Sequence, residues 1–304
     1  MRVLVAGGTG FIGRALCARL ADEGHEVIVW SRRASAAIPA GASTVVTTLA
    51  ALAATGIDTV FNLAGAPIAD RRWSAARKRL LVESRVRTTA GIVDWMRGSA
   101  SRPRALISAS AVGYYGEQGD RQISEDTAPT PGFSHELCAA WEREAMAAQS
   151  LGVRVCVVRT GVVLGRGGGA LARMAPAFQL GLGGRLGAGT HHVPWIHRDD
   201  VVAIYLWLMN TQHASGAYNA SAPNPVTNGE LTRLLAATLH RPAFMVVPAG
   251  LLRLALGEMS ELLLGSDRML PVRLLQAGFQ FRYPELAPAL RDIYARRSAA
   301  PGQD

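Results

Sequence analysis

The chain of 304 residues contains a single lysine, Lys78. The other 31 of its 32 basic residues are arginines, and the formal net charge is +9. One lysine excludes mechanisms that need a lysine elsewhere, such as Schiff-base catalysis or phosphate binding by a Walker loop. The arginines are scattered, in runs of no more than two, whereas nucleic-acid-binding proteins cluster their basic residues. We therefore expect no nucleic-acid partner.

The chain is also poor in cysteine and in long apolar segments. Its three cysteines, Cys17, Cys138 and Cys156, are odd in number and widely spaced, which argues against a disulfide framework. The longest apolar run covers residues 201–209, whereas a membrane-spanning helix needs about 20 residues. The N-terminus begins in a strand-like run without a signal-peptide pattern. These features predict a cytoplasmic protein with no membrane partner.

Short apolar runs alternate with helical stretches over the first 160 residues. The runs predict strands at 2–6, 26–30, 59–64, 105–109 and 153–159. Helical periodicity lies between them, at 11–23, 75–96 and 134–150. This order is typical of a parallel sheet covered by helices on both faces. We predict an α/β fold, a Rossmann-like doubly wound parallel sheet with a smaller, mostly helical C-terminal region on the substrate side.

The sequence changes in character after residue 160. A glycine-rich stretch surrounds an apolar helix at 170–180, and further helices are predicted at 200–210 and 229–239. Two or three short helices rich in Leu and Arg follow from residue 248. We predict a dinucleotide-binding domain over 1–160 and a mixed region over 161–247 that completes the sheet and the substrate groove. A helical segment is predicted over 248–296.

A glycine-rich motif lies between the first strand and the first helix. Gly7 allows a tight turn, Gly10 lets the backbone approach a pyrophosphate, and Gly13 permits close packing of helix on strand. The N-terminus of the helix would offer its backbone N–H groups and positive dipole to the phosphates. The motif therefore predicts a dinucleotide site.

The end of the second strand indicates which dinucleotide binds. A site for NAD usually has an Asp or Glu there to hold the ribose 2′-hydroxyl. This strand instead ends in Trp30, Ser31, Arg32 and Arg33. A guanidinium from Arg32 suits a 2′-phosphate, and Ser31 adds a hydroxyl donor. We expect NADP rather than NAD.

Several motifs in a consistent order then resemble one family across nearly the whole chain. The sequence is similar to the extended short-chain dehydrogenases/reductases, in the atypical epimerase-like group with a C-terminal DUF1731 segment. The resemblance rests on these segments: 7–13, 62–65, 84–85, 108–116, 159–165, 167–170, 181–184, 194–197, 199–200, 218–219, 277–279 and 283–286. It implies cofactor contacts at Thr9, Gly10, Phe11, Ile12, Ser31, Arg32, Asn62, Leu63, Arg85 and Val162.

The catalytic pair of that superfamily is absent. A Tyr-x-x-x-Lys motif carries the acid–base chemistry there, but the only lysine of this chain lies far from the matching helix, where Ser134 and Cys138 take the two places. The expected serine is present as Ser110, at the end of a strand. Tyr114 or Tyr115, in the glycine-flanked loop that follows, could replace the missing tyrosine as proton donor. We expect Cys138 to be a core residue rather than a nucleophile.

Other polar residues suggest no further chemistry. His191, His192 and His197 with Asp199 and Asp200 match no common metal-ligand spacing, so no metal site is predicted. His197 and Asp199 are expected to line the groove or to cap the helix that follows.

Two functions remain open. One is an NADP-dependent oxidoreductase or epimerase of non-standard mechanism that acts on an unidentified small molecule. The other is a catalytically quiet NADP-binding protein that serves as a regulator or sensor. The sequence leaves the oligomeric state open.

Overall fold

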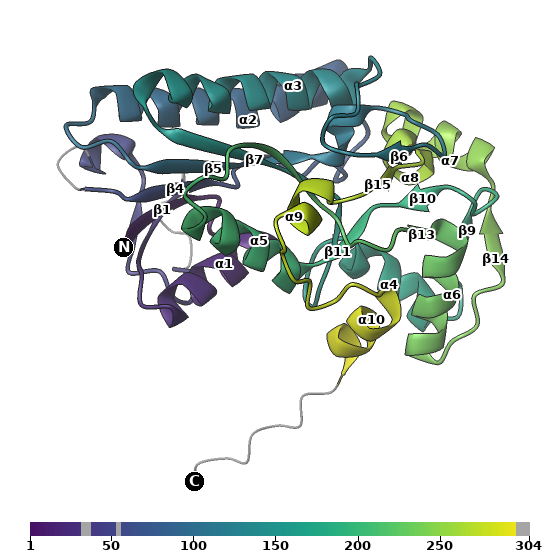
Figure 1. The fold of residues 1–304 in the computed structure, drawn as a ribbon. Helices are drawn as coiled ribbons and strands as arrows, with labels where there is room; N and C mark the ends of the chain where they lie inside the picture. Colours follow the sequence, from purple (N-terminus) through teal and green to yellow (C-terminus); the bar gives the residue numbers. More distant parts are fainter. Residues whose placement is uncertain (32–37, 53–55, 296–304) are drawn as a thin grey trace, which may run out of the picture.

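A seven-stranded parallel sheet forms the centre of the protein in the computed structural model, which describes residues 1–31, 38–52 and 56–295 (Figure 1). Strands β1 and β4 are buried almost throughout, because both faces of a central parallel strand are covered. Across the sheet, the strands are β12 (Gly216–Ala220), β7 (Arg154–Thr160), β5 (Ala105–Ala111), β4 (Thr59–Asn62), β1 (Arg2–Ala6), β2 (Glu26–Trp30) and β3 (Thr44–Val46).

Helices cover both faces of this sheet. Helices α1 (Phe11–Asp22) and α5 (Arg198–Asn210) pack on one face, and α2 (Ala75–Gly98) and α3 (Phe133–Met146) on the other (Figure 1). Side chains alternate along β1, so Val3 joins the core under α1 and α5, while Leu4 joins the opposite core. Short 3-10 helices lie between the main elements: η1 (Leu49–Leu52), η2 (Val112–Tyr115), η3 (Ala147–Leu151) and η4 (Gly257–Ser260).

The second half of the chain adds a smaller lobe, on the right of Figure 1. Four two-stranded ladders belong to this half or join it to the first half: β8 (Val162–Leu164) with β11 (Trp195–His197), β9 (Gly184–Leu186) with β14 (Met245–Val247), β10 (His192–Val193) with β13 (Val226–Thr227), and β6 (Gln122–Ile123) with β15 (Arg268–Met269). Its helices are α4 (Leu171–Gln179), α6 (Asn228–Leu239), α7 (Ala249–Leu256), α8 (Glu261–Leu264), α9 (Val272–Gln276) and α10 (Leu286–Tyr294).

A buried carboxylate attaches the C-terminal segment to helix α5. Asp200, at the start of α5, accepts hydrogen bonds from the backbone N–H groups of Arg282 (2.8 Å) and Tyr283 (3.0 Å). Helix α10 then packs on α6. The C-terminal segment is therefore held against both α5 and the smaller lobe.

The predicted fold class is confirmed, and the differences are local. The predicted helix at 134–150 becomes 3-10 after Met146, and the third strand, β3, was not predicted because it has only three residues. Over residues 248–295 the C-terminal segment contains four α-helices rather than two or three, because Gly257 and Gly265 divide the Leu-rich stretch. His197 does cap α5, since its ring Nδ1 accepts a hydrogen bond from the Asp199 N–H at 3.1 Å.

Candidate functional site

The sheet has a topological switch point between β1 and β4. The chain leaves β1 toward α1 on one face and leaves β4 toward α2 on the other face, although the two strands are neighbours in the sheet. Ligands of open α/β sheets bind at such a point, beyond the carboxyl ends of the strands. The glycine motif and residues 62–65 both lie at this edge.

The loop of the glycine motif is packed so closely that Gly7 and Gly13 admit no side chain. Gly7 has a φ of +81°, and a Cβ on it would lie 2.7 Å from the Leu63 carbonyl. A Cβ on Gly13 would lie 2.2 Å from the Gly7 carbonyl oxygen. Gly7 therefore requires glycine for its backbone conformation as well as for space, and Gly13 requires it for the contact of α1 with the loop.

The N-terminus of α1 is open to an anion. Gly10 is the N-cap, and it supplies no side chain to bond the first-turn N–H groups of Phe11, Ile12 and Gly13. The first turn contains no acidic residue, so the positive end of the helix is not neutralised there. A pyrophosphate fits these features, because they leave backbone donors and a positive potential beside a loop without side chains.

The ring of Phe11 packs against a second glycine cluster, at Gly168 and Gly169. A Cβ on Gly168 would lie 2.3 Å from the Phe11 ring, and one on Gly169 would lie 2.8 Å from it. The glycine-rich stretch that follows β8 is thus shaped to receive the first residue of α1. Thr9 lies in the same loop, where its carbonyl accepts a hydrogen bond from Arg14 at 2.7 Å.

One of the two residues predicted to select the cofactor, Ser31, lies at the end of β2. Ser31 follows this strand directly, and its backbone N–H donates to the Val46 carbonyl at 3.0 Å. Arg32 lies outside the described residues, so its contact with a 2′-phosphate stays a prediction.

The remaining predicted cofactor residues have different surroundings. Asn62 is fully buried, and its amide donates to Thr89 at 2.8 Å and to Ser108 at 3.2 Å. The Asn62 side chain therefore links the carboxyl end of β4 to helix α2 and strand β5. Leu63 lies against Gly7, whereas Val162 begins β8 and bonds through its N–H to the Pro194 carbonyl at 2.7 Å.

Arg85 is turned inward toward the same edge. Its guanidinium donates to the carbonyls of Ala66 (3.1 Å) and Leu81 (3.2 Å) and lies 5.2 Å from the Trp141 ring. Burial lowers the pKa of Arg85. In this arrangement Arg85 holds the loop after β4 in place.

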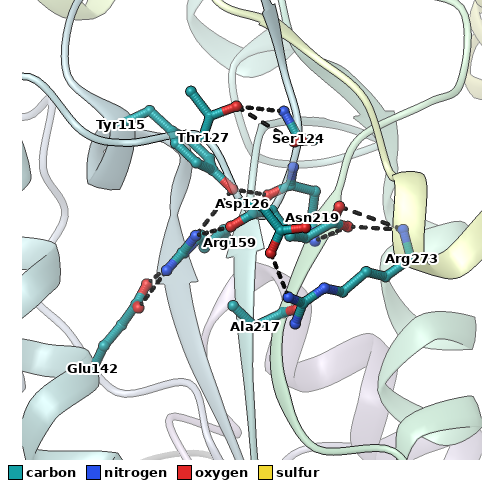
Figure 2. A network of polar contacts seen from close by, with 10 residues as sticks. Tyr115, Ser124, Asp126, Thr127, Glu142, Arg159, Ala217, Asn219 and Arg273 are labelled. Carbon is teal, nitrogen blue, oxygen red and sulfur yellow. Dashed lines mark hydrogen bonds and ion pairs between the residues drawn. The ribbon is translucent and has the colours of Figure 1, made fainter.

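Ser110, the predicted catalytic serine, is buried at the end of β5. Its hydroxyl donates to the Glu142 carboxylate at 2.6 Å. Arg159, at the end of β7, donates to the same carboxylate through Nε and Nη2, both at 2.9 Å (Figure 2). Burial alone would lower the pKa of Arg159, but the bonds and attraction to Glu142 outweigh this effect and raise it. A charged pair thus lies beside the predicted serine.

The two candidate tyrosines flank this pair differently. The Tyr115 ring is fully buried, and its hydroxyl donates to Asn219 at 2.6 Å and accepts from Arg159 at 3.0 Å. Burial raises the pKa of Tyr115 to about 12, although Arg159 opposes the shift. Tyr114 is only half-buried, and the Arg159 guanidinium lies 3.3 Å from its ring centroid. Tyr114 is therefore better placed to meet a substrate.

The polar network continues into the C-terminal segment. The Asn219 N–H donates to the buried Glu125 carboxylate at 3.0 Å, and the Arg273 N–H lies 3.3 Å from both oxygens of that carboxylate. The Arg273 side chain also bonds Asp126 at 2.6 Å (Figure 2). Sequence reasoning missed Glu142 and Glu125, because a lone Glu in a helix or loop resembles a surface residue.

The positions that match the absent catalytic pair are both buried on α3. Burial raises the pKa of the Cys138 thiol to about 12, which agrees with the prediction of a core residue rather than a nucleophile. The Ser134 hydroxyl bonds the Glu261 carboxylate of the C-terminal segment. Lys78 forms an ion pair with Glu258 of that segment. The single lysine of the chain thus links helix α2 to the C-terminal segment.

Glu261 is one of three carboxylates that lie near one another. Burial, with repulsion from Glu117 and Glu261, raises the pKa of Asp267 to about 7. Glu117 reaches this group from the loop after Tyr115 and accepts from the Ser266 N–H at 3.4 Å. Within the described ranges, no group of three or more His, Cys, Asp or Glu residues has the arrangement of a metal site.

None of the described helices is long and apolar enough to cross a membrane.

Comparisons with known proteins agree with this geometry. The model of the NAD dependent epimerase/dehydratase family matches residues 3–221, and that of DUF1731, a domain of unknown function, matches residues 247–293. The mouse epimerase family protein SDR39U1 is 39% identical over 97% of this chain and its own full length. The chloroplastic SDR39U1 homolog of Arabidopsis thaliana is 39% identical over 96% of this chain and 86% of its own length.

A solved structure extends the agreement to the fold. The human epimerase family protein SDR39U1, isoform 2, crystallised with NADPH, is 37% identical to this chain with a TM-score of 0.86. The match covers 96% of this chain and 99% of the human one. The chain therefore belongs to the NAD dependent epimerase/dehydratase family, in the atypical short-chain dehydrogenase/reductase group that carries a C-terminal DUF1731 segment.

Proposed function

We propose that the crevice between β1 and β4 binds NADPH and that the protein transfers a hydride to or from a small molecule. The observation that carries this proposal is the cradle made by Gly7, Gly13 and the uncapped N-terminus of α1. The absence of an acidic residue after β2, where Ser31 and Arg32 stand, favours NADPH over NADH. The NADPH bound to the human relative supports the same choice.

The residues around Arg159 would handle the proton. When bound, the cofactor supplies or accepts the hydride. Tyr114 is the proposed proton donor, because its ring is partly exposed while the Tyr115 hydroxyl is engaged with Asn219. Ser110 would hold Glu142, and through it Arg159, in the position that fixes the Tyr114 ring. Arg159 thereby supplies a cation next to the tyrosine where relatives with the usual motif have a lysine.

Cofactor titration tests the binding step. NADPH should bind more tightly than NADH, and Arg32→Ala should remove the preference while leaving NADH binding intact. Arg19→Ala is a suitable control, because Arg19 lies on the outer side of α1 in an ion pair with Glu23. Equal titration curves for the two cofactors with the unmodified protein would contradict the assignment.

A catalytically quiet NADPH-binding protein is the second candidate. It is favoured by the finding that the Ser110 and Tyr115 hydroxyls both donate to internal partners, Glu142 and Asn219. A panel of aldehydes, ketones and sugar nucleotides distinguishes the two functions through oxidation of NADPH. Turnover that Tyr114→Phe abolishes supports the enzyme. Binding of NADPH without turnover of any panel member favours the quiet protein.

A further inference from the structure

A series of buried hydrogen bonds joins the C-terminal segment to Arg159 (Figure 2). Asn219 on β12 and Arg159 on β7 lie opposite each other in the sheet. The Asn219 side-chain amide donates to the Leu270 carbonyl at 3.0 Å, and its oxygen accepts from the Tyr115 hydroxyl at 2.6 Å. That hydroxyl accepts from Arg159 Nη1 at 3.0 Å. Asn219 and Tyr115 are fully buried, so solvent has little access to these bonds.

The direction of each bond in this series is fixed by its two ends. The Leu270 carbonyl can only accept, and the Arg159 guanidinium can only donate. The NH2 group of Asn219 must therefore face Leu270, which turns the amide oxygen toward Tyr115. The Tyr115 hydroxyl then gives its hydrogen to that oxygen and offers a lone pair to Arg159. The reverse direction would set two acceptors against each other at one end and two donors at the other.

A second buried group holds the backbone of Asn219. The Glu125 carboxylate accepts from the Asn219 N–H at 3.0 Å and from the Arg273 N–H at 3.3 Å. The backbone carbonyl of Glu125 accepts from Arg159 Nη1 at 3.1 Å. Glu125 thus contacts β12, the C-terminal segment and Arg159 together. A buried polar network whose members are all bonded is rigid, so the Asn219 side chain has little freedom to turn.

The Leu270 carbonyl has a fixed place because the residues around it are anchored to β6 and to the end of β12. Strand β15 pairs with β6, and the Leu270 N–H donates to the Ile123 carbonyl at 2.9 Å. The Ser221 hydroxyl, directly after β12, donates to the Met269 carbonyl at 2.9 Å. The C-terminal segment therefore presents a rigid acceptor to Asn219.

The series helps to decide where the Arg159 guanidinium lies. Its Nε and Nη2 bond Glu142, whereas its Nη1 bonds the Tyr115 hydroxyl and the Glu125 carbonyl. A guanidinium is planar, so bonds at all three nitrogens fix its plane as well as its place. The Tyr114 ring lies against this group, with its centroid 3.3 Å away. A shift of the series would therefore move the cation that lies on Tyr114.

We propose that Asn219 is a positioning residue, through which the C-terminal segment holds the Arg159 guanidinium against the Tyr114 ring. Leu270 lies within residues 247–293, which the DUF1731 model matches, so this part of the chain helps to shape the active site. This role rests on the proposed function, because the place of Tyr114 affects turnover only if Tyr114 donates the proton. The contact between Arg159 and Tyr114 can nevertheless be measured without a substrate.

Nuclear Overhauser effects (NOEs) in a sample labelled at arginine and tyrosine measure this contact. The unmodified protein should show NOEs between an arginine side chain and the Tyr114 ring, whose signals are identified by their loss in Tyr114→Phe. Asn219→Leu and Tyr115→Phe each interrupt the series. Both variants should weaken these NOEs at least about twofold, since a network with a missing bond no longer fixes its members.

Asn224→Leu is the matched control. Asn224 also bonds the C-terminal segment, through the Pro284 carbonyl at 3.3 Å, but it is exposed and lies outside the series. This variant should keep the NOEs of the unmodified protein. Full NOEs in Tyr115→Phe and in a folded Asn219→Leu would overturn the proposal. If Asn219→Leu shows no cooperative thermal unfolding, Tyr115→Phe decides alone.

Steady-state rates give a second readout with any substrate that the panel identifies. Asn219→Leu and Tyr115→Phe should lower kcat at least about tenfold, because a misplaced catalytic group loses rate, while NADPH affinity and KM change little. Asn224→Leu should keep the unmodified kcat. Loss of the NOEs with an unchanged kcat would show that Asn219 does not position the active site. Absence of turnover with every panel member would count against the proposed function alone, because the NOEs still decide on Asn219.

Discussion

The guanidinium of Arg159 lies 3.3 Å from the ring centroid of Tyr114 and 5.1 Å from that of Tyr115. The same group donates two hydrogen bonds to Glu142, which also accepts from Ser110. The buried ion pair of Arg159 and Glu142 therefore contacts all three residues that the sequence predicts to be catalytic. These are Ser110, Tyr114 and Tyr115.

Removal of Arg159 should destabilise the protein strongly. In Arg159→Met, Glu142 keeps a buried charge to which, among the described residues, only Ser110 still donates a hydrogen bond. Breaking a buried ion pair on one side costs about 3–5 kcal/mol. Urea unfolding measures the change. Arg97→Met, which breaks an exposed pair with Asp94, is the control and should change the free energy of unfolding by less than about 1 kcal/mol. A loss no larger than that of the control would show that the buried pair is dispensable.

Ser110 and Cys138 should differ in their effect on activity. The Ser110 hydroxyl contacts Glu142, so Ser110→Ala disturbs the group that fixes Arg159 and Tyr114. Cys138→Ala removes a buried thiol that contacts Ser110, but it leaves the groups of the Ser110–Glu142 hydrogen bond in place. Steady-state rates of NADPH oxidation, with any substrate that the panel identifies, should fall at least about tenfold more in Ser110→Ala than in Cys138→Ala. The reverse order would contradict our placement of the active site.

The sequence predicts the cofactor half well because its signals are local. A Cβ on Gly7 or Gly13 would meet backbone atoms, so these positions admit only glycine and the motif is visible in the sequence. The strands β1, β2 and β7 contain runs of at least three consecutive apolar residues, because both of their faces are buried.

The polar network was not predictable in the same way. Ser110 and Glu142 are 32 residues apart in the chain, and Tyr115 and Asn219 are 104 apart. No periodicity links such residues, and an isolated glutamate has the same local pattern whether it lies in solvent or beside a buried arginine. The partner of Arg159 is set by the packing of α3 against β5 and β7, which only the fold reveals.

The glycine cradle should tolerate no side chain at residue 13. A Cβ there would lie 2.2 Å from the Gly7 carbonyl oxygen, so Gly13→Ala forces α1 away from the loop and should weaken NADPH binding at least about a hundredfold. Gly91→Ala is the matched control, because nothing lies within 4 Å of a Cβ at this position in α2. That variant should bind NADPH normally and gain about 0.5–1 kcal/mol of stability. Normal NADPH affinity in Gly13→Ala would contradict the proposed cradle.

Asp267 should make the stability depend on pH. Burial and repulsion from Glu117 and Glu261 raise its pKa to about 7, whereas the pKa in the unfolded chain is about 4. Between these pH values the folded state binds the proton that the unfolded state has released. The contribution of Asp267 to the free energy of unfolding therefore falls as pH rises from about 4 to 7, and it is constant above that range.

The Asp267→Asn variant isolates this contribution, because its side chain does not ionise. At pH 8 the variant should be more stable than the unmodified protein by about 2–4 kcal/mol, since each pKa unit corresponds to about 1.4 kcal/mol. At pH 4, where Asp267 keeps its proton in the folded state, the two proteins should differ little. Urea unfolding across this pH range measures the difference. Asp94→Asn removes the same charge at an exposed position, so its free energy of unfolding should depend on pH in the same way as that of the unmodified protein. A difference between Asp267→Asn and the unmodified protein that does not grow with pH would show that Asp267 is ionised and well solvated in the folded state.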